Sequence, residues 1–172
     1  MKNIVFIQAR LNSTRFPNKI LSKYKKYTML EILINRLKLS RKINKIVVIT
    51  PSVERKSKIG KIVKKLNIPI FYGSENNVLK RYYEAAKKFK ADNIIRITSD
   101  CPLIDPFLLD RMLDKYEKSK YDYLSNTLKP TFPDGLDIEI FNKNTLKLAN
   151  NEAKTTHDLE HVTPYIKLNK KF

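Results

Sequence analysis

The chain has 172 residues, enough for a single domain with a sizeable hydrophobic core. Its 35 lysines and arginines outnumber its 17 aspartates and glutamates, and the formal net charge of +18 suits nucleic acid, an anionic membrane or an anionic small substrate. The lysines are spread over nearly every expected helix instead of forming one block, which indicates a generally basic surface and argues against a nucleic-acid-binding arm.

Cysteine content and hydropathy indicate the compartment. Cys101 is the only cysteine, so an internal disulfide is excluded and a reducing environment fits. No apolar run approaches the length of a membrane span, and the first residues lack the pattern of a signal peptide. We therefore expect a cytoplasmic protein that binds neither membrane nor nucleic acid.

The first elements are a strand and a helix. Residues 3–8 form a continuous apolar run, which is typical of a parallel strand buried on both faces. Thr28 and Glu31 have the spacing of a capping box, and apolar residues at helical spacing follow over residues 30–37. The pattern predicts a buried strand and then an amphipathic helix.

The same alternation continues through the middle of the chain. Residues 45–50 form a second apolar run, and Ser52 is expected to cap a second helix. A third short strand is expected at residues 68–72, and Asn76 or Asn77 is expected to begin a third helix.

The last predicted elements include a strand that alternates apolar and polar residues, unlike the continuous apolar strands before it. A fourth strand is expected at residues 93–98, and Asp105 before Pro106 is a strong helix start. Residues 121–125 predict a fifth strand. Residues 136–141 alternate apolar and polar side chains, so we expect this strand to be covered on one face only.

Strand–helix alternation of this kind predicts an α/β fold, a three-layer sandwich with a mainly parallel sheet, in one domain over residues 1–172. Ligands of such sheets bind at the carboxyl ends of the strands. This rule brings the loop at residues 10–19, the Gly73-Ser74 pair and Asp100 to one edge of the sheet. Three loops far apart in the sequence are thus expected to form one cleft.

The loop after the first strand carries the most informative residues of the chain. Three cations and two hydroxyls, which suit a polyphosphate, occur there: Arg10, Ser13, Thr14, Arg15 and Lys19. Arginine presents forked donors that match phosphate oxygens, and lysine adds a mobile point charge. The alternative is an ordinary solvated basic loop.

Two acidic positions could complete such a site. Asp100 follows the fourth strand and could hold the Mg²⁺ that accompanies a triphosphate, although an aspartate there is also a common turn residue. Asp137 and Glu139 are expected on one face of the strand at residues 136–141. Asp137 could then hold a metal or a sugar hydroxyl, or lie on an exposed strand face.

Two other patterns are interpreted as structural. His157 to His161 matches the short H-x-x-E-H metal-protease pattern, but the segment offers no clear third ligand. Cys101 has no evident base and is interpreted as a small buried residue.

Ten short motifs run in order over almost the whole chain. They are Ile7-Gln8-Ala9-Arg10, Ser13-Thr14-Arg15, Pro17-Asn18-Lys19, Gly73-Ser74-Glu75, Val78-Leu79, Arg81-Tyr82, Arg96-Ile97-Thr98, Asp100-Cys101-Pro102-Leu103-Ile104-Asp105-Pro106, Pro133-Asp134-Gly135-Leu136-Asp137 and Glu160-His161-Val162-Thr163-Pro164-Tyr165. In this order the chain resembles the cytidylyltransferases that activate acidic sugars. The resemblance is strongest to spore coat polysaccharide biosynthesis protein F, and weaker to acylneuraminate and 3-deoxy-manno-octulosonate cytidylyltransferases.

The resemblance implies a nucleotide-diphospho-sugar transferase fold of the GT-A type, CTP and an acidic sugar as substrates, Mg²⁺ as cofactor and, as in much of the family, a homodimer. Carried over by position, Arg10, Lys19 and Asp100 are the implied catalytic residues, with Asp100 and Asp137 as metal ligands. The implied substrate-binding residues are Ala9, Ser13, Thr14, Arg15, Ser74, Asn77, Asp137, Glu160 and His161.

The chain departs from the family pattern in three places. Asn18 and Ser99 stand where the family commonly has glycine. Family members also continue past the Glu160–Tyr165 motif to a strand that ends in a metal-binding acidic residue, and the sequence stops at Phe172. The expectation is a fragment, an enzyme that uses Asp137 instead, or a weak enzyme; the rival hypotheses are a non-catalytic nucleotide-binding remnant that needs a partner chain, and a nucleic-acid binder.

Overall fold

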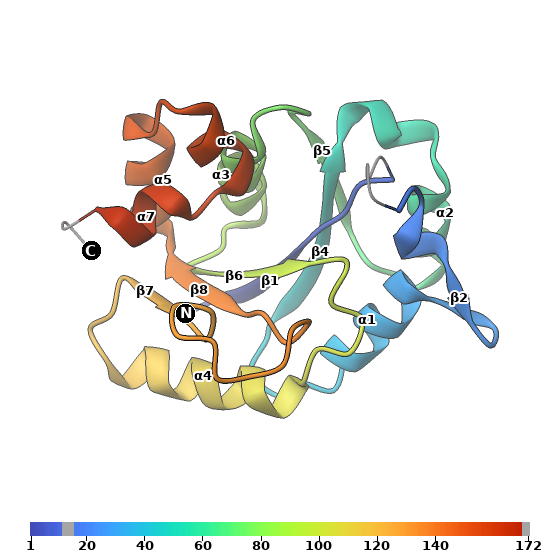
Figure 1. Cartoon of the computed structure of the whole chain (residues 1–172), viewed down its shortest axis with the longest axis horizontal. Helices are drawn as coiled ribbons and strands as arrows, with labels where there is room; N and C mark the ends of the chain where they lie inside the picture. Colours follow the sequence, from blue (N-terminus) through green and yellow to red (C-terminus); the bar gives the residue numbers. More distant parts are fainter. Residues whose placement is uncertain (12–15, 170–172) are drawn as a thin grey trace.

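Six strands form the central sheet in the order β5-β4-β1-β6-β8-β7, as seen in the computed structural model, which describes residues 1–11 and 16–169 (Figure 1). The four strands from β5 to β6 run parallel, whereas β8 is antiparallel to both β6 and β7. The strands of this sheet are β1 (Asn3–Gln8), β4 (Lys45–Pro51), β5 (Ile70–Gly73), β6 (Asn93–Thr98), β7 (Tyr123–Ser125) and β8 (Glu139–Asn142). The prediction of a mainly parallel sheet is confirmed.

Helices cover both faces of this sheet (Figure 1). They are α1 (Met29–Leu37), α2 (Lys58–Lys65), α3 (Val78–Phe89), α4 (Pro106–Lys118), α5 (Lys143–Glu152), α6 (Thr156–His161) and α7 (Pro164–Leu168). Smaller elements are the 3-10 turns η1 (Lys19–Leu21) and η2 (Ser52–Lys56) and a hairpin of β2 (Lys23–Tyr24) and β3 (Tyr27–Thr28). None of the helices among these residues is long and apolar enough to cross a bilayer.

Alternation along the strands divides the core into two layers. Val5 and Ile7 of β1 pack with α1, α2 and α4 on one face, whereas Ile4 and Phe6 pack with α3, α5 and α7 on the other. Successive side chains of a strand point to opposite faces, so a continuous apolar run is what a strand between two helical layers requires. The three-layer sandwich is confirmed.

Local signals place several helix starts correctly. Thr28 and Glu31 form the complete capping box of α1, and the Asn77 side chain caps α3 by accepting from the Lys80 amide. The Asp105 carboxylate accepts from the Phe107 and Leu108 amides at the start of α4, where Pro106 is the first helical residue. These short-range hydrogen bonds need no tertiary context, which is why the sequence reveals them.

Two predictions of local structure are wrong. Ser52 begins the 3-10 turn η2, and the residue that caps α2 is Ser57. The strand expected to be covered on one face is buried on both, because Ile140 lies in one core layer and Phe141 in the other. Glu139 is only 3% exposed, since an internal ion pair compensates its burial.

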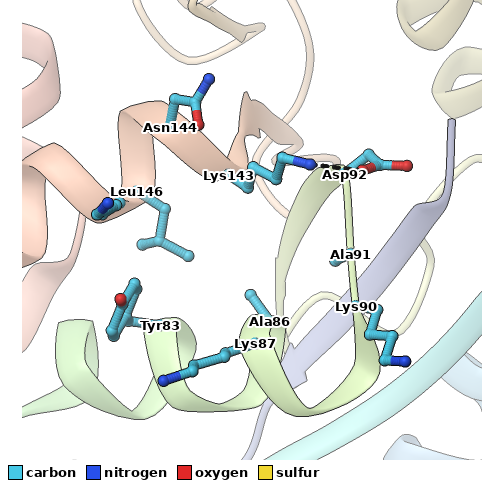
Figure 2. A pocket seen from close by; sticks show the side chains of 10 residues that line it. Tyr83, Ala86, Lys87, Lys90, Ala91, Asp92, Lys143, Asn144 and Leu146 are labelled. Atoms are coloured by element: carbon cyan, nitrogen blue, oxygen red, sulfur yellow. Dashed lines mark hydrogen bonds and ion pairs between the residues drawn. The ribbon is translucent and has the colours of Figure 1, made fainter.

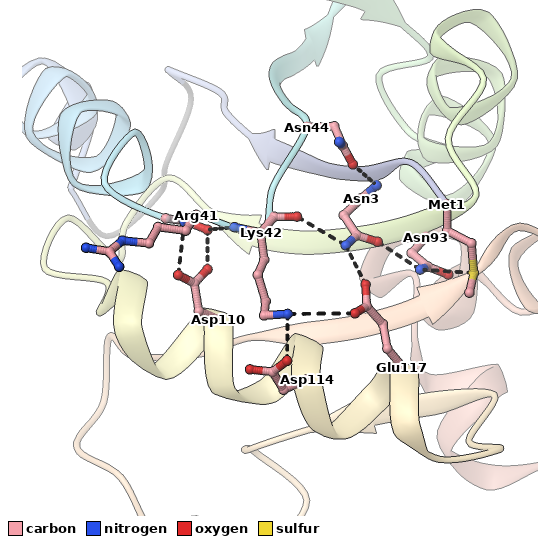
Figure 3. A network of polar contacts seen from close by, with 10 residues as sticks. Met1, Asn3, Arg41, Lys42, Asn44, Asn93, Asp110, Asp114 and Glu117 are labelled. Carbon is pink, nitrogen blue, oxygen red and sulfur yellow. Dashed lines mark hydrogen bonds and ion pairs between the residues drawn. The ribbon is translucent and has the colours of Figure 1, made fainter.

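A network of asparagines fastens the amino ends of the strands (Figure 3). The Asn3 side chain donates to the Lys42 carbonyl at 3.1 Å and to Glu117 of α4 at 2.9 Å, and it accepts from Asn93 of β6 at 2.8 Å. The Asn3 amide donates to the Asn44 side chain at 2.7 Å. These hydrogen bonds join the amino ends of the strands. The candidate site lies at the opposite ends, where the parallel strands finish.

Candidate functional site

The pair formed by Lys19 and Asp100 marks the centre of the carboxyl edge. Asp100 follows β6 and Lys19 begins η1, and the Lys19 Nζ donates to Asp100 Oδ2 at 2.6 Å. Burial alone would raise the pKa of Asp100, but hydrogen bonds from Lys19 and Thr98 and the charge of Lys19 outweigh burial and lower it. The carboxylate is therefore ionised near neutral pH and able to accept a cation.

The end of β1 supplies the next part of the site. Ala9 is fully buried, and its amide donates to the Ile49 carbonyl at 3.0 Å, which ties the loop to β4. Arg10 is exposed, with its Nη1 3.9 Å from Glu160 Oε1 of α6. Its guanidinium is thus accessible to a ligand. Three further residues of the predicted phosphate loop, Ser13, Thr14 and Arg15, lie outside the described residues.

An arginine hollow of about 110 Å³ opens beside this loop. Its polar lining includes Gln8, Arg10, Arg81, Arg96, Glu160 and His161. Of the three loops expected to form one cleft, only the first places a predicted residue, Arg10, in the lining of this hollow. Ser74 is linked to the hollow through its hydrogen bond with Arg81, and Lys19 and Asp100 are not among the lining residues.

Arg81 connects this hollow to the turn after β5. Its side chain is 1% exposed, and its Nη1 donates to the Ser74 carbonyl at 2.6 Å. The Ser74 hydroxyl accepts from the Asn77 amide at 3.1 Å, so both predicted residues order the start of α3. A Cβ at Gly73 would lie 2.9 Å from Arg81 Cγ, which explains the glycine by close approach. The turn is held by a buried cation.

A carboxylate hollow of about 120 Å³ lies on the other side of Arg96. It is lined by Arg96, Thr98, Thr127, Asp137, Glu139 and Lys167. Arg96 lines both hollows, so the two hollows are neighbours that share this residue. Asp137 and Glu139, which are expected on one strand face, both belong to this lining.

Glu139 is the hub of the carboxylate hollow. It forms an ion pair with Arg96 and accepts from the Tyr123 hydroxyl at 2.6 Å, the Thr163 hydroxyl at 2.8 Å and the Lys167 Nζ at 3.0 Å. Burial alone would raise its pKa, but the charges of Arg96 and Lys167 and the hydrogen bonds outweigh burial and lower the pKa to about 2. The network fixes Arg96 in place.

Asp137 behaves in the opposite way. It is exposed before β8, and its pKa is raised by desolvation and then by the neighbouring negative charges of Asp134, Glu139 and Asp100. A divalent cation would relieve this repulsion. Nevertheless, the part of the chain that the structure describes contains no cluster of three or more His, Cys, Asp or Glu arranged to hold a metal. Any metal here would therefore need ligands from a bound phosphate and water.

The two patterns interpreted as structural can now be placed. His157 and His161 lie one helical turn apart on α6 with ring centroids 4.6 Å apart, and His161 also lines the arginine hollow. Cys101 is 5% exposed, and burial raises the pKa of its thiol, which suits a packed residue and not a nucleophile.

The lining residues that sequence reasoning missed include Gln8, Arg81, Arg96 and Lys167. Gln8 and Arg96 could have been found, because Gln8 directly follows the apolar residues 4–7 of β1 and Arg96 interrupts the apolar residues 94–97 of β6. Arg81 likewise interrupts the inward stripe of α3. Lys167 gives no signal in a chain with so many lysines.

Comparisons with known proteins bear on the identity of the chain. A family model described as Cytidylyltransferase matches residues 4–172. The chain is 40% identical over 166 residues to the uncharacterized protein MJ1063 of Methanocaldococcus jannaschii, covering 96% of this chain and 67% of that protein. It is 34% identical over 175 residues to the spore coat polysaccharide biosynthesis protein SpsF of Bacillus subtilis, covering 97% and 71%. It is 27% identical over 158 residues to the 3-deoxy-manno-octulosonate cytidylyltransferase of Blochmanniella floridana, covering 88% and 60%.

Solved structures agree with these matches. A cytidylyltransferase from Leptospira borgpetersenii superimposes with a TM-score of 0.93 at 38% identity, covering 99% of this chain and 73% of that one. A CMP:2-keto-3-deoxy-manno-octonic acid synthetase complexed with CTP gives a TM-score of 0.75 at 15% identity over 98% of this chain and 85% of the other, which shows the shared fold alone. Because the family model, the relatives and the fold agree over nearly the whole chain, the protein belongs to the cytidylyltransferase family.

Proposed function

We propose that this cytidylyltransferase transfers CMP from CTP to an acidic sugar, a nonulosonic or ulosonic acid, for the synthesis of a surface polysaccharide. The observation that carries the proposal is the 2.6 Å pair of Lys19 and Asp100 at the carboxyl edge, with Arg10 beside the same loop. The pair supplies a cation for phosphates and a carboxylate for a metal. Arg10 adds a second cation at the neighbouring strand end, because β1 and β6 are paired as far as Gln8 and Thr98. The functions named for two relatives, spore coat polysaccharide biosynthesis and 3-deoxy-manno-octulosonate activation, support the substrate class.

The proposed reaction is a displacement at the α-phosphorus of CTP. The anomeric hydroxyl oxygen of the sugar forms the new bond to phosphorus, and the bond from phosphorus to the oxygen that bridges to the β-phosphate breaks. The hydroxyl proton is lost to solvent or a base, and pyrophosphate leaves. Arg10 and Lys19 would bind the triphosphate and stabilise the charge that develops on it, because positioning and electrostatics dominate catalysis of such displacements.

The carboxylates fit a magnesium ion that arrives with the nucleotide. Asp100 is ionised, and the pKa of Asp137 is raised first by desolvation and then by the repulsion of neighbouring carboxylates. Mg²⁺ in proteins is commonly held by one or two carboxylates together with substrate phosphates and water. Asp100 and Asp137 would hold the ion, and the bound ion would neutralise phosphate charge.

The acceptor sugar is assigned to the carboxylate hollow and its border. Thr98, Thr127 and Asp137 offer hydroxyl and carboxylate partners for sugar hydroxyls. Arg96 and Lys167 offer cations for the acid group of the sugar. Glu160 and His161 border the arginine hollow, where the proposal places them between nucleotide and sugar.

Calorimetric titration with nucleotides tests the first half of the proposal. With Mg²⁺ present, CTP should bind to one site, and ATP, GTP and UTP should bind at least roughly tenfold more weakly. Pyrophosphate release with a panel of acidic sugars then tests the second half. If a folded chain binds no nucleotide, the proposal fails and a non-catalytic remnant explains the sequence better.

A further inference from the structure

A lysine-rimmed groove lies near the start of β6 and the end of β8, at the opposite ends of the strands from the candidate site. It has a volume of about 300 Å³ and separates the C-terminal half of α3 from the start of α5 (Figure 2). Its apolar lining consists of Ala86, Ala91 and Leu146, which are at most 5% exposed, and the ring of Tyr83. The groove is open because Ala86 and Ala91 are small, and larger side chains at these positions would fill the space between the helices.

The rim of this groove is strongly cationic. Lys87 and Lys90 lie on the α3 side, Lys143 and Lys147 lie on the α5 side, and Asp92 is the one acidic residue of the lining. Asp92 is already occupied, because it accepts from the Lys2 amide at 2.9 Å and from the Lys143 Nζ at 3.0 Å. Among the described residues the other three lysines have no ion pair.

The geometry excludes a compact anion as the natural occupant. In Figure 2 the amino groups of Lys87 and Lys90 point to opposite sides, so these two cations do not converge on one phosphate. The first amides of α5 are also unavailable, since those of Asn144 and Thr145 donate to the Asn142 side chain at 2.9 Å. Charges spread along a chain match the rim better than charge gathered at a point.

We propose that this groove docks an acidic segment of a partner protein, which inserts one aliphatic side chain between α3 and α5. The apolar floor suits an aliphatic side chain, and the cationic rim complements carboxylates on either side of it. A second copy of this chain is a poor occupant, because it would bring a further net charge of +18. Nucleic acid is disfavoured because the hollow is floored by alanine and leucine and not by a row of stacking aromatics.

The test uses a defined probe and the full chain. The probe is a fluorescein-labelled nonapeptide of alternating aspartate and glutamate with one central leucine, and its binding is followed by fluorescence anisotropy in about 0.1 M salt. The docking variant is Lys87→Glu/Lys147→Glu, and the matched control is Lys115→Glu/Lys118→Glu, two exposed lysines of α4 in the other helical layer. All four positions are exposed, so both variants should fold.

We expect the peptide to bind the unaltered protein and the control within a factor of about three, and to bind the docking variant roughly tenfold more weakly. Replacing the peptide leucine with serine should weaken binding several-fold, since it removes the apolar contact. Equal losses in both variants would show attraction to net charge and overturn the proposal, as would the absence of peptide binding. Tighter binding of a single-stranded oligothymidine that is lost in the docking variant would assign the groove to nucleic acid instead.

Discussion

Four donors from three parts of the fold meet on the carboxylate of Glu139. Arg96 comes from β6, Tyr123 from β7, and Thr163 and Lys167 from the C-terminal helices. A buried charge is tolerated only when it is paired and hydrogen-bonded, so this residue holds both the sheet and Arg96 in position. Its effect on stability should therefore depend on pH.

Replacing Glu139 with glutamine should lower the free energy of unfolding on the order of 3 kcal/mol at neutral pH, because Arg96 and Lys167 lose their counter-charge. The pKa of Glu139 is about 2 in the folded protein against a usual value of 4.5, so the unfolded chain takes up the proton first as the pH falls. The stabilisation is complete above about pH 4.5 and is lost towards pH 2. Urea unfolding of the unaltered and Glu139→Gln proteins from pH 7 to pH 2 measures the difference in their free energies of unfolding. A difference that does not shrink as the pH falls would contradict the role of this charge.

Arg10 should matter for catalysis and not for folding. Its side chain is 56% exposed and its nearest ion-pair partner is 3.9 Å away. Arg10→Ala should therefore leave the melting temperature nearly unchanged, while turnover falls on the order of 10²–10³-fold through lost stabilisation of the phosphate charge. Pyrophosphate release and thermal melting check both parts, with Lys118→Ala on α4 as an exposed cationic control. Unchanged turnover in a folded Arg10→Ala protein would remove Arg10 from the site.

At the scale of elements, local hydrogen bonds decide where helices begin and the sheet decides which faces they bury. The Asp105 cap of α4 illustrates the first effect, because one carboxylate oxygen accepts from two amides that have no helical partner. α4 in turn carries the apolar stripe that closes one face of the sheet next to the site.

Asp105→Ala should cost about 1 kcal/mol of stability by leaving these amides without an acceptor. Lys115→Ala, an exposed position on the same helix, should change stability by less than about 0.5 kcal/mol. Chemical denaturation of the two variants and the unaltered protein compares their free energies of unfolding. Equal effects would mean that the cap contributes no more than an ordinary surface residue.

For the whole molecule, the excess of basic residues lowers the stability of the folded state. With a formal charge of +18, like charges repel across the surface and destabilise the compact state. The asparagine network and the paired carboxylates hold the strand ends against this repulsion.

Raising sodium chloride from about 10 to about 200 mM should therefore raise the melting temperature by a few degrees, because salt screens the repulsion. A Lys61→Glu/Lys64→Glu protein, in which two charge reversals lower the formal charge from +18 to +14, should show a smaller rise. Scanning calorimetry at several salt concentrations measures the melting temperatures of both proteins. A melting temperature that falls with salt would show that attractive ion pairs outweigh the repulsion.

The sequence by itself determined the fold class, the order of the main elements and the edge of the sheet at which Lys19 and Asp100 meet. Buried strands, the capping box and the Asp105 start are encoded within a few neighbouring residues, and the rule for parallel sheets then brings Lys19 and Asp100 to one edge. Only the tertiary structure decided the rest. Which polar residues are buried, as for Glu139, Arg81 and Arg96, depends on partners that lie 7 to 43 positions away in the chain. The groove between α3 and α5 likewise arises from the packing of two helices, since no local pattern states how closely two distant helices approach each other.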